Sequence, residues 1–166
     1  PKATIDIPEK MRVVDVLYYS DDAKIHKGQI VIHRKLAYDI KKIFALAFKM
    51  KFPIQKAIPI SHPWYKWDDT RSVTANNTSA FNYRTIAGKD KLSTHGMGMS
   101  IDINPRSNPY IGEKGKVTPR GAHYDPSKPG TLHADHPIVK EFDRLGWDWG
   151  GDWETIKDYQ HFEKKI

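Results

Sequence analysis

The sequence predicts an α+β fold, in which one long helix and several short helices pack on a central antiparallel sheet. Three observations lead to this class. Strand-like runs of valine, isoleucine and aromatic residues recur along the chain, and one long segment has helical periodicity. The chain has 166 residues, of which 39% are hydrophobic, so it is long enough for a core of its own. We therefore expect a single domain over residues 1–166, with the strands gathered in a sheet and the helices against it.

The first part of the chain is expected to form two strands followed by the long helix. Residues 12–19 and 29–33 are rich in valine, isoleucine and tyrosine, and Lys27 and Gly28 before the second run are interpreted as a turn. In residues 34–51, apolar side chains recur at three- and four-residue steps and lysines occupy the opposite side. This pattern is typical of an amphipathic helix.

The next segments complete the N-terminal part of the domain, residues 1–79. Pro53 marks the end of the long helix, and residues 54–60 are expected to be a strand. Residues 61–78 have an irregular pattern with two tryptophans and two adjacent asparagines, and are interpreted mostly as loop. Residues 80–85 fit a short strand that begins the second half.

Residues 100–104 are the predicted strand that matters most for function. Side chains alternate between the two faces of a strand, so Ile101 and Ile103 are expected in the core. Asp102 and Asn104 then face the other way, toward a site.

Three further segments complete the predicted fold. Residues 106–135 are rich in glycine, proline and lysine without a sustained period, so they are interpreted as an insertion or as the wall of a cleft. Residues 137–145 are a predicted short helix with a proline in its first turn and a glycine after its end. Residues 158–163 are the predicted final strand, so the half formed by residues 80–163 holds the candidate site.

The composition excludes several classes of protein. The chain has no cysteine, which rules out a disulfide framework and a thiolate zinc site. The net charge of +7 favours anionic partners such as nucleic acid, phosphate polymers or bacterial wall, although a solvated basic surface explains it equally well. No nucleic-acid-binding motif is present. No apolar run approaches the roughly 18 residues that span a bilayer.

Two histidines and one aspartate form the most informative pattern. His95 and Asp102 lie seven residues apart around a glycine turn, and His161 follows near the C-terminus. Two imidazoles and one carboxylate make a catalytic zinc site that leaves a position for water. The alternative is that the histidines lie on the surface and Asp102 merely ends a strand, because eight histidines offer many chance pairs.

Two further side chains would complete a hydrolase site. Asp158 lies three residues before His161, so it would be held close to the same ion as a general base. Arg84 could stabilise an oxyanion or bind a substrate carboxylate through its planar fork. Each residue also has a structural interpretation, as a solvent-facing aspartate and a surface arginine. Trp153, with the neighbouring tryptophans, suits either core packing or the lining of a cleft.

Taken together, these residues resemble the D-alanyl-D-alanine carboxypeptidase and L-alanyl-D-glutamate endopeptidase family of zinc peptidases, the VanY-like group that shares its fold with the hedgehog signalling domain. The family pattern is matched by Ser93, His95, Gly98, Asp102, Asp158 and His161. Residues 81–84, 102–105, 108–110, 149–153 and 161–163 are also similar to segments of these proteins. The resemblance covers residues 80–163, about half of the chain.

The resemblance implies that Zn²⁺ is bound by His95, Asp102 and His161, with Asp158 as the base. It implies that Arg84 lies near the scissile carbonyl and that Ser93 lies near the site, where both would bind substrate. The substrate would be the stem peptide of bacterial peptidoglycan, an anionic polymer that suits a basic protein. Aspartate as the base is familiar among the endopeptidases.

The expected setting follows from that substrate. A location in the cell envelope or outside the cell is favoured, although the sequence shows no signal peptide. The chain begins with Pro1 in place of methionine, so removal of a leader or of another domain is compatible with the sequence. A monomer is expected.

Two other classes of function remain open. A hedgehog-type module would hold a metal without catalysis, but a mere binder need not keep Asp158 and Arg84. A non-haem iron oxygenase also uses two histidines and one carboxylate, but there the first histidine and the carboxylate are usually two residues apart. The sequence leaves open which bond is cleaved and whether the protein serves wall growth, recycling or phage-driven lysis.

Overall fold

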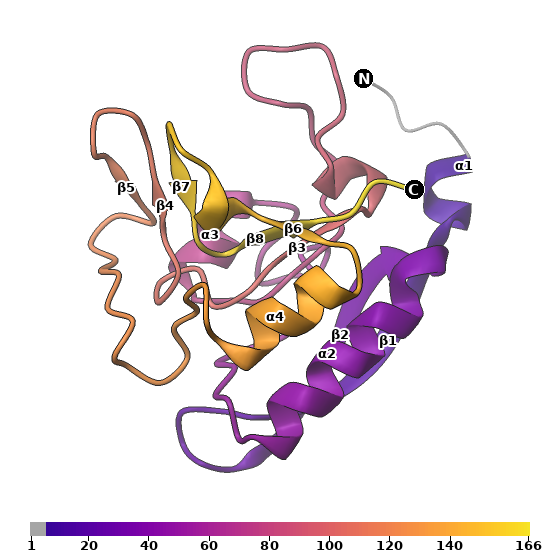
Figure 1. The fold of residues 1–166 in the computed structure, drawn as a ribbon. Coiled ribbons are helices and arrows are strands. Elements are labelled where there is room, and N and C mark those ends of the chain that lie inside the picture. Colours follow the sequence, from indigo (N-terminus) through magenta and orange to yellow (C-terminus); the bar gives the residue numbers. More distant parts are fainter. Residues whose placement is uncertain (1–5) are drawn as a thin grey trace.

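The computed structural model describes residues 6–166 and shows an α+β architecture of short strands and few helices (Figure 1). The helices are α1 (Asp6–Glu9), α2 (Ala37–Lys49), α3 (Asp69–Thr74) and α4 (Pro137–Arg144). The strands are β1 (Met11–Tyr19), β2 (Ile25–His33), β3 (Ser100–Asp102), β4 (Tyr110–Ile111), β5 (Val117–Thr118), β6 (Asp148–Trp149), β7 (Lys157–Asp158) and β8 (His161–Glu163). Short 3-10 turns are η1 (Arg34–Leu36), η2 (His95–Met97) and η3 (Gly150–Asp152).

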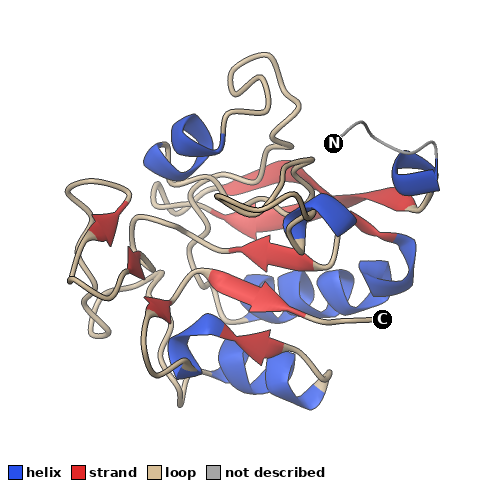
Figure 2. Cartoon of the chain, turned by 90° about the horizontal axis from the view of Figure 1, so that it is seen from above, coloured by secondary structure: helices blue, strands red, loops and turns tan. Residues whose placement is uncertain are grey.

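The described strands form three small antiparallel sheets, β1-β2, β3-β8-β6 and β5-β4-β7, in place of the single central sheet that the sequence predicted. The first two run side by side (Figure 2) and are joined by the chain between them. The amide of Phe81 donates to the carbonyl of Val31 in β2 at 2.9 Å, and Ser79 and Asp102 exchange two backbone hydrogen bonds. These two sheets form one layer but remain separate, because residues 79–81 between them make only single backbone contacts and no continuous ladder of hydrogen bonds.

The hydrophobic core lies between this layer and the helices α2 and α4. Ile101 and Ile103 are buried in it, as the alternation of the strand predicted. On the neighbouring strand, Phe162 stacks on Phe142 of α4 with ring centroids 3.9 Å apart. Because successive side chains alternate, Asp102 and His161 face away from the helices, and the two are directly paired across β3 and β8. Burial of Ile101 and Phe162 in the core therefore places Asp102 and His161 together on the opposite face of β3 and β8.

The N-terminal strands and the long helix are confirmed, but two of their boundaries were wrong. Lys27 and Gly28 lie inside β2, which pairs with β1 from Ile25 onward, and the turn falls earlier at residues 20–24. Gly28 is needed for a close approach, since a Cβ there would lie 2.5 Å from the carbonyl oxygen of Ala57. Residues 34–51 begin with the 3-10 turn η1, and the α-helix ends at Lys49.

Two predicted strands are absent from the described chain, and one helix was missed. Residues 54–60 form no named strand and pair only through isolated contacts, such as the bridge between Lys56 and Asn77. Residues 80–85 also form no named strand. Within the predicted loop, α3 forms because the Asp68 side chain accepts a hydrogen bond from the Arg71 amide and caps its first turn.

The C-terminal part differs from the prediction mainly in residues 106–135. They contain the β4–β5 hairpin, and β4 pairs with β7 so that Tyr110 lies opposite Asp158. The predicted final strand is split into β7 and β8 by a turn at residues 159–160, and the short helix before it is confirmed as α4. Within residues 6–166, no helix has the length and apolar character to cross a membrane.

Candidate metal centre

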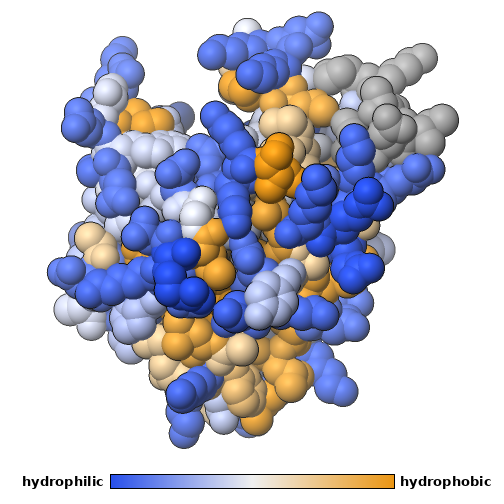
Figure 3. Space-filling model, turned by 45° about the vertical axis from the view of Figure 1, so that its right-hand side comes forward, coloured by the Kyte–Doolittle hydropathy of each residue, from blue (hydrophilic) through white to orange (hydrophobic). Residues whose placement is uncertain are grey.

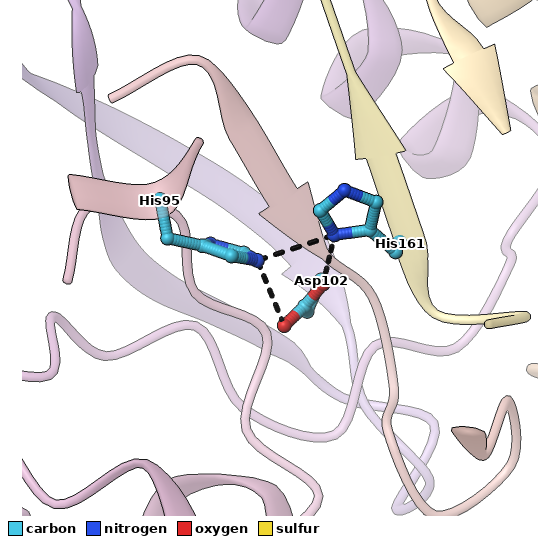
Figure 4. Close-up of side chains that lie close together, drawn as sticks. All are labelled: His95, Asp102 and His161. Atoms are coloured by element: carbon cyan, nitrogen blue, oxygen red, sulfur yellow. Dashed lines mark hydrogen bonds and ion pairs between the residues drawn. The ribbon is translucent and has the colours of Figure 1, made fainter. Parts of the chain in front are cut away.

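Three buried side chains meet on the face of β3 and β8 that points away from the helices. The Nε2 atom of His95 lies 3.2 Å from Oδ2 of Asp102, and Nδ1 of His161 lies 3.2 Å from Oδ1 of the same carboxylate. The two imidazole nitrogens are themselves 3.2 Å apart (Figure 4). One ligand atom from each residue therefore falls within a small triangle, and it is the one group of potential metal ligands found among the described residues.

The size of this triangle fits a zinc ion. A tetrahedral site with zinc–nitrogen and zinc–oxygen bonds of about 2.0–2.1 Å has ligand atoms about 3.3 Å apart. The two imidazole nitrogens are 3.2 Å apart, which matches that edge length, and each lies 3.2 Å from a different oxygen of Asp102. One ligand atom from each residue lies within 4.8 Å of the others, so a small rotation of the Asp102 carboxylate would bring one oxygen to an ion held by both imidazoles. Three protein ligands leave the fourth corner of the tetrahedron for a water molecule or a substrate oxygen.

The position of His95 is set by the tight turn η2. Ser93, which is buried, accepts a hydrogen bond from the Gly96 amide at 3.0 Å and closes the turn. Gly98 ends it with φ +65°, and a Cβ there would lie 2.3 Å from the sulfur of Met11. The glycines that the sequence places after the histidine are therefore required by the backbone conformation and by close packing. Ser93 supports the turn, and its predicted contact with substrate stays a prediction.

Both imidazoles have a second partner that orients the ring. Nδ1 of His95 lies 2.7 Å from the carbonyl oxygen of Ala80, so that nitrogen carries the proton and Nε2 is free to bind a metal. Nε2 of His161 lies 3.9 Å from Oε2 of Glu163, which is close enough for an ion pair but too long for a hydrogen bond. Carboxylates and carbonyls commonly occupy this position behind a metal-binding histidine. Sequence analysis missed Glu163, although a strand places residues 161 and 163 on one face.

Within this group, neighbouring opposite charges shift pKa values toward the charged forms of the side chains. Burial alone would raise the pKa of Asp102, but the imidazoles of His95 and His161 outweigh it and hold that pKa well below its usual range. Burial favours the neutral form of His161, yet the carboxylates of Asp102 and Glu163 raise its pKa to about 10. The group therefore combines an anionic oxygen with an imidazole that holds a proton until a cation displaces it.

Asp158 lies beside this group, on β7. Its Oδ1 atom is buried and has no hydrogen-bond partner among the described residues. Burial, together with the Asp102 carboxylate, raises the pKa of Asp158 to about 7. Gly150 packs directly against it, since a Cβ at that position would lie 2.8 Å from the Cβ of Asp158. The carboxylate is thus held firmly, with an oxygen available for a proton.

Arg84 lies on the same segment as Ala80, and its backbone contacts the turn that carries His95. Its backbone carbonyl accepts the Ser93 amide at 3.0 Å, which ties it to the turn that holds His95. Its Nη2 atom lies 3.9 Å from Oδ2 of Asp69, and its buried Nε has no hydrogen-bond partner among the described residues. The side chain is 39% exposed and its contact with Asp69 is long, so the outer nitrogens of the guanidinium could bind a substrate oxygen.

Other residues singled out in the sequence take structural positions. The indole of Trp153 lies 5.5 Å from the imidazole of His161, whereas Trp147 and Trp149 are buried in the core. Asn104 does not face the site as predicted. Its amide donates to the carbonyls of Pro53 and Gly130, so it fastens two loops together.

A comparison with known families gives an independent indication. Residues 87–164 match a family model described as D-alanyl-D-alanine carboxypeptidase. The matched region contains His95, Asp102, Asp158 and His161, and Arg84 lies just before it. No curated protein and no solved structure matches the chain. The match spans just under half of the chain and supports a peptidase, and the buried histidine–aspartate–histidine group within it could bind a metal ion.

Proposed function

We propose that the protein is a zinc-dependent peptidase of the VanY-like group that hydrolyses peptide bonds in the stem peptides of bacterial peptidoglycan. The observation that carries the proposal is the triangle of His95, Asp102 and His161 with the carboxylate of Asp158 beside it. A bound zinc ion would polarise the attacked carbonyl and lower the pKa of its water to about 7.

The protein's own residues have distinct roles in this proposal. Asp158 accepts a proton from the attacking water and passes it to the leaving amine, because a pKa of about 7 allows it both to take and to give a proton near neutral pH. Arg84 uses its partly exposed guanidinium to hold a carbonyl or carboxylate oxygen of the substrate. Ser93 shapes the turn under His95 and contacts substrate from there.

The substrate class follows from the charge of the protein and the family match. Stem peptides contain D-amino acids and free carboxylates, which suit a chain of net charge +7. The site is compatible with cleavage of either a terminal D-alanine or an internal bond. Because stem peptides lie in the bacterial wall, we expect the activity at the cell envelope or outside the cell. All proposed ligands, the base and the arginine come from one chain, which supports a monomer as the acting unit.

The proposal is tested by mass spectrometry of muropeptides digested with the zinc-loaded protein, since product masses identify the cleaved bond. Chelation should abolish hydrolysis and added zinc should restore it. Asp158→Ala should keep zinc and lose about 10²- to 10⁴-fold in turnover. The matched control is Asp152→Ala, an exposed aspartate of the same segment, which should keep full activity. Equal hydrolysis after complete metal removal would refute the zinc mechanism, and a zinc-loaded protein that cleaves no stem peptide would favour a hedgehog-type binding module.

A further inference from the structure

An elongated groove lies on the face of the β1–β2 hairpin that points away from α2, outside the region that matches the family model. Three cross-strand pairs form its floor, Val13 with Val31, Asp15 with Gln29, and Leu17 with Lys27. Residues 59–67 form its wall. The groove has two hollows, with volumes of about 690 Å³ and 270 Å³, which meet at Pro59. Its floor extends for about 13 Å along β1, enough for about two or three linked sugar rings.

The wall displays an aromatic side chain that the fold does not need for packing. Trp64 is 65% exposed and lines the larger hollow, and its one ring neighbour among the described residues is His62, at 4.8 Å. Much of the face shown in Figure 3 is hydrophilic, with hydrophobic side chains gathered in patches. A large indole left in solvent beside a hollow is typical of a binding surface.

The loop that presents Trp64 is held in a strained conformation. Lys66 and Trp67 both have left-handed backbones, with φ +48° and +65°, which costs roughly 1–2 kcal/mol for each residue without a glycine. Two hydrogen bonds fix the loop, from the Lys66 amide to His62 and from the Trp67 amide to Ile60, both 2.9 Å long. Strain of this kind is retained where a fixed shape is required.

The groove leads to the metal centre. Phe81 lines the smaller hollow and packs edge-on against Trp67 at 5.8 Å. Its amide is bonded to Val31 in the floor, and the next amide, that of Asn82, donates to the carbonyl of His95 at 3.1 Å. A linear polymer lying in the groove would therefore pass next to the turn that carries a candidate metal ligand.

We propose that this groove binds the glycan strand of peptidoglycan, so that the attached stem peptide reaches the metal centre. This inference rests on the proposed function. An indole face packs against the C–H face of a pyranose ring, while the hydrogen-bonded pair of Asp15 and Gln29, 3.1 Å apart, offers acceptors and donors to hydroxyl and acetamido groups.

Other polymers fit the groove less well. An extended peptide would add to the free edge of a strand, but both hollows lie over the face of the hairpin, where the backbone is already paired. The charges of the lining are mixed, with Asp15 and Lys27 on the floor and Arg12 in the smaller hollow, so the groove lacks the uniformly basic surface that a polyanion with a charge on every unit requires. A polymer with apolar ring faces, polar substituents and few charges matches both the indole and the mixed floor.

The test is binding to glycan strands from which an amidase has removed all stem peptides. Trp64→Ala should lower the affinity by about tenfold or more, because it removes the exposed aromatic surface and leaves the core intact. The matched control is Tyr38→Ala, which removes an equally exposed aromatic (66%) from α2 and should bind as the unaltered protein does. Trp64→Ala should also cleave intact wall more slowly by a similar factor, while its cleavage of a free stem peptide stays unchanged.

The outcomes separate this inference from the proposed function. An unaltered protein that does not bind the peptide-free strands, or a Trp64→Ala variant that binds them equally well, overturns the glycan site. A zinc-loaded protein that binds the strands but cleaves neither free nor attached stem peptides retains the site and refutes the peptidase.

Discussion

Replacing Gly150 with alanine should impair turnover without affecting metal binding. A Cβ at this position would lie 2.4 Å from the carbonyl oxygen and 2.8 Å from the Cβ of Asp158, whereas real Cβ atoms do not approach other heavy atoms closer than 3.0 Å. Asp158 must therefore move by roughly half an ångström or more, and displacements of about 1 Å cost on the order of 10²-fold in rate. We expect kcat on a stem peptide to fall by about 10- to 100-fold.

The zinc content of Gly150→Ala should remain at one ion per chain, because His95, Asp102 and His161 lie on other elements. The matched control is Gly112→Ala in the β4–β5 hairpin, where a Cβ would meet its nearest neighbour at an ordinary 3.5 Å. Steady-state kinetics, zinc analysis and a melting curve on the three proteins separate a displaced base from a lost metal or an unfolded chain. Full turnover in a folded, zinc-loaded Gly150→Ala would refute the assignment of Asp158 as the base.

Three further perturbations test the centre and its support. Zinc affinity should rise about tenfold per pH unit between about pH 7 and pH 8, because the pKa of His161 is raised to about 10 and a bound metal must displace that proton. Affinities measured by calorimetry that stay constant with pH would contradict this. Ser100→Ala should raise the free energy of unfolding by about 1 kcal/mol, since it removes a buried hydroxyl that has no hydrogen-bond partner among the described residues; a lowered melting temperature would count against it. Asp39→Ala should lower the free energy of unfolding by about 2–4 kcal/mol, because the carboxylate accepts hydrogen bonds from the indole of Trp147 at 2.9 Å and from Lys164 at 3.1 Å. Denaturant unfolding should show a smaller loss for Asp39→Asn.

The spatial grouping of the candidate ligands could be predicted because it depends on local rules. Alternation along residues 100–104 separates the core-facing isoleucines from Asp102, and the same rule separates Phe162 from His161. What alternation cannot give is the pairing of the two strands. That Asp102 lies directly opposite His161 depends on contacts between segments about 60 residues apart, which no periodicity reveals.

The parts of the fold that could not be predicted are held by side chains and single backbone contacts. Residues 54–60 have the composition of a strand, yet they lie between loops to which they are tied by Asn77 and Asn104 side chains. The helix α3 is only six residues long, so it has no measurable period, and its one sequence signal is the capping aspartate Asp68. The role of Asp39 in the long helix could not be predicted either, because its partner Lys164 lies 125 residues away.

Residues 106–135 have a larger part in the site than a cleft wall. The proposed base Asp158 and the candidate ligand His161 are three residues apart, but they belong to two different sheets. His161 is set by β3, whereas Asp158 is set by its pairing with β4 from residues 106–135. Between them, the ring of Tyr159 stacks on Tyr124 of the same segment, with centroids 3.7 Å apart. The candidate ligands Asp102 and His161 therefore rest on the pairing of β3 with β8, while the proposed base rests on this segment. We expect changes within residues 106–135 to alter catalysis while the metal group keeps its own support.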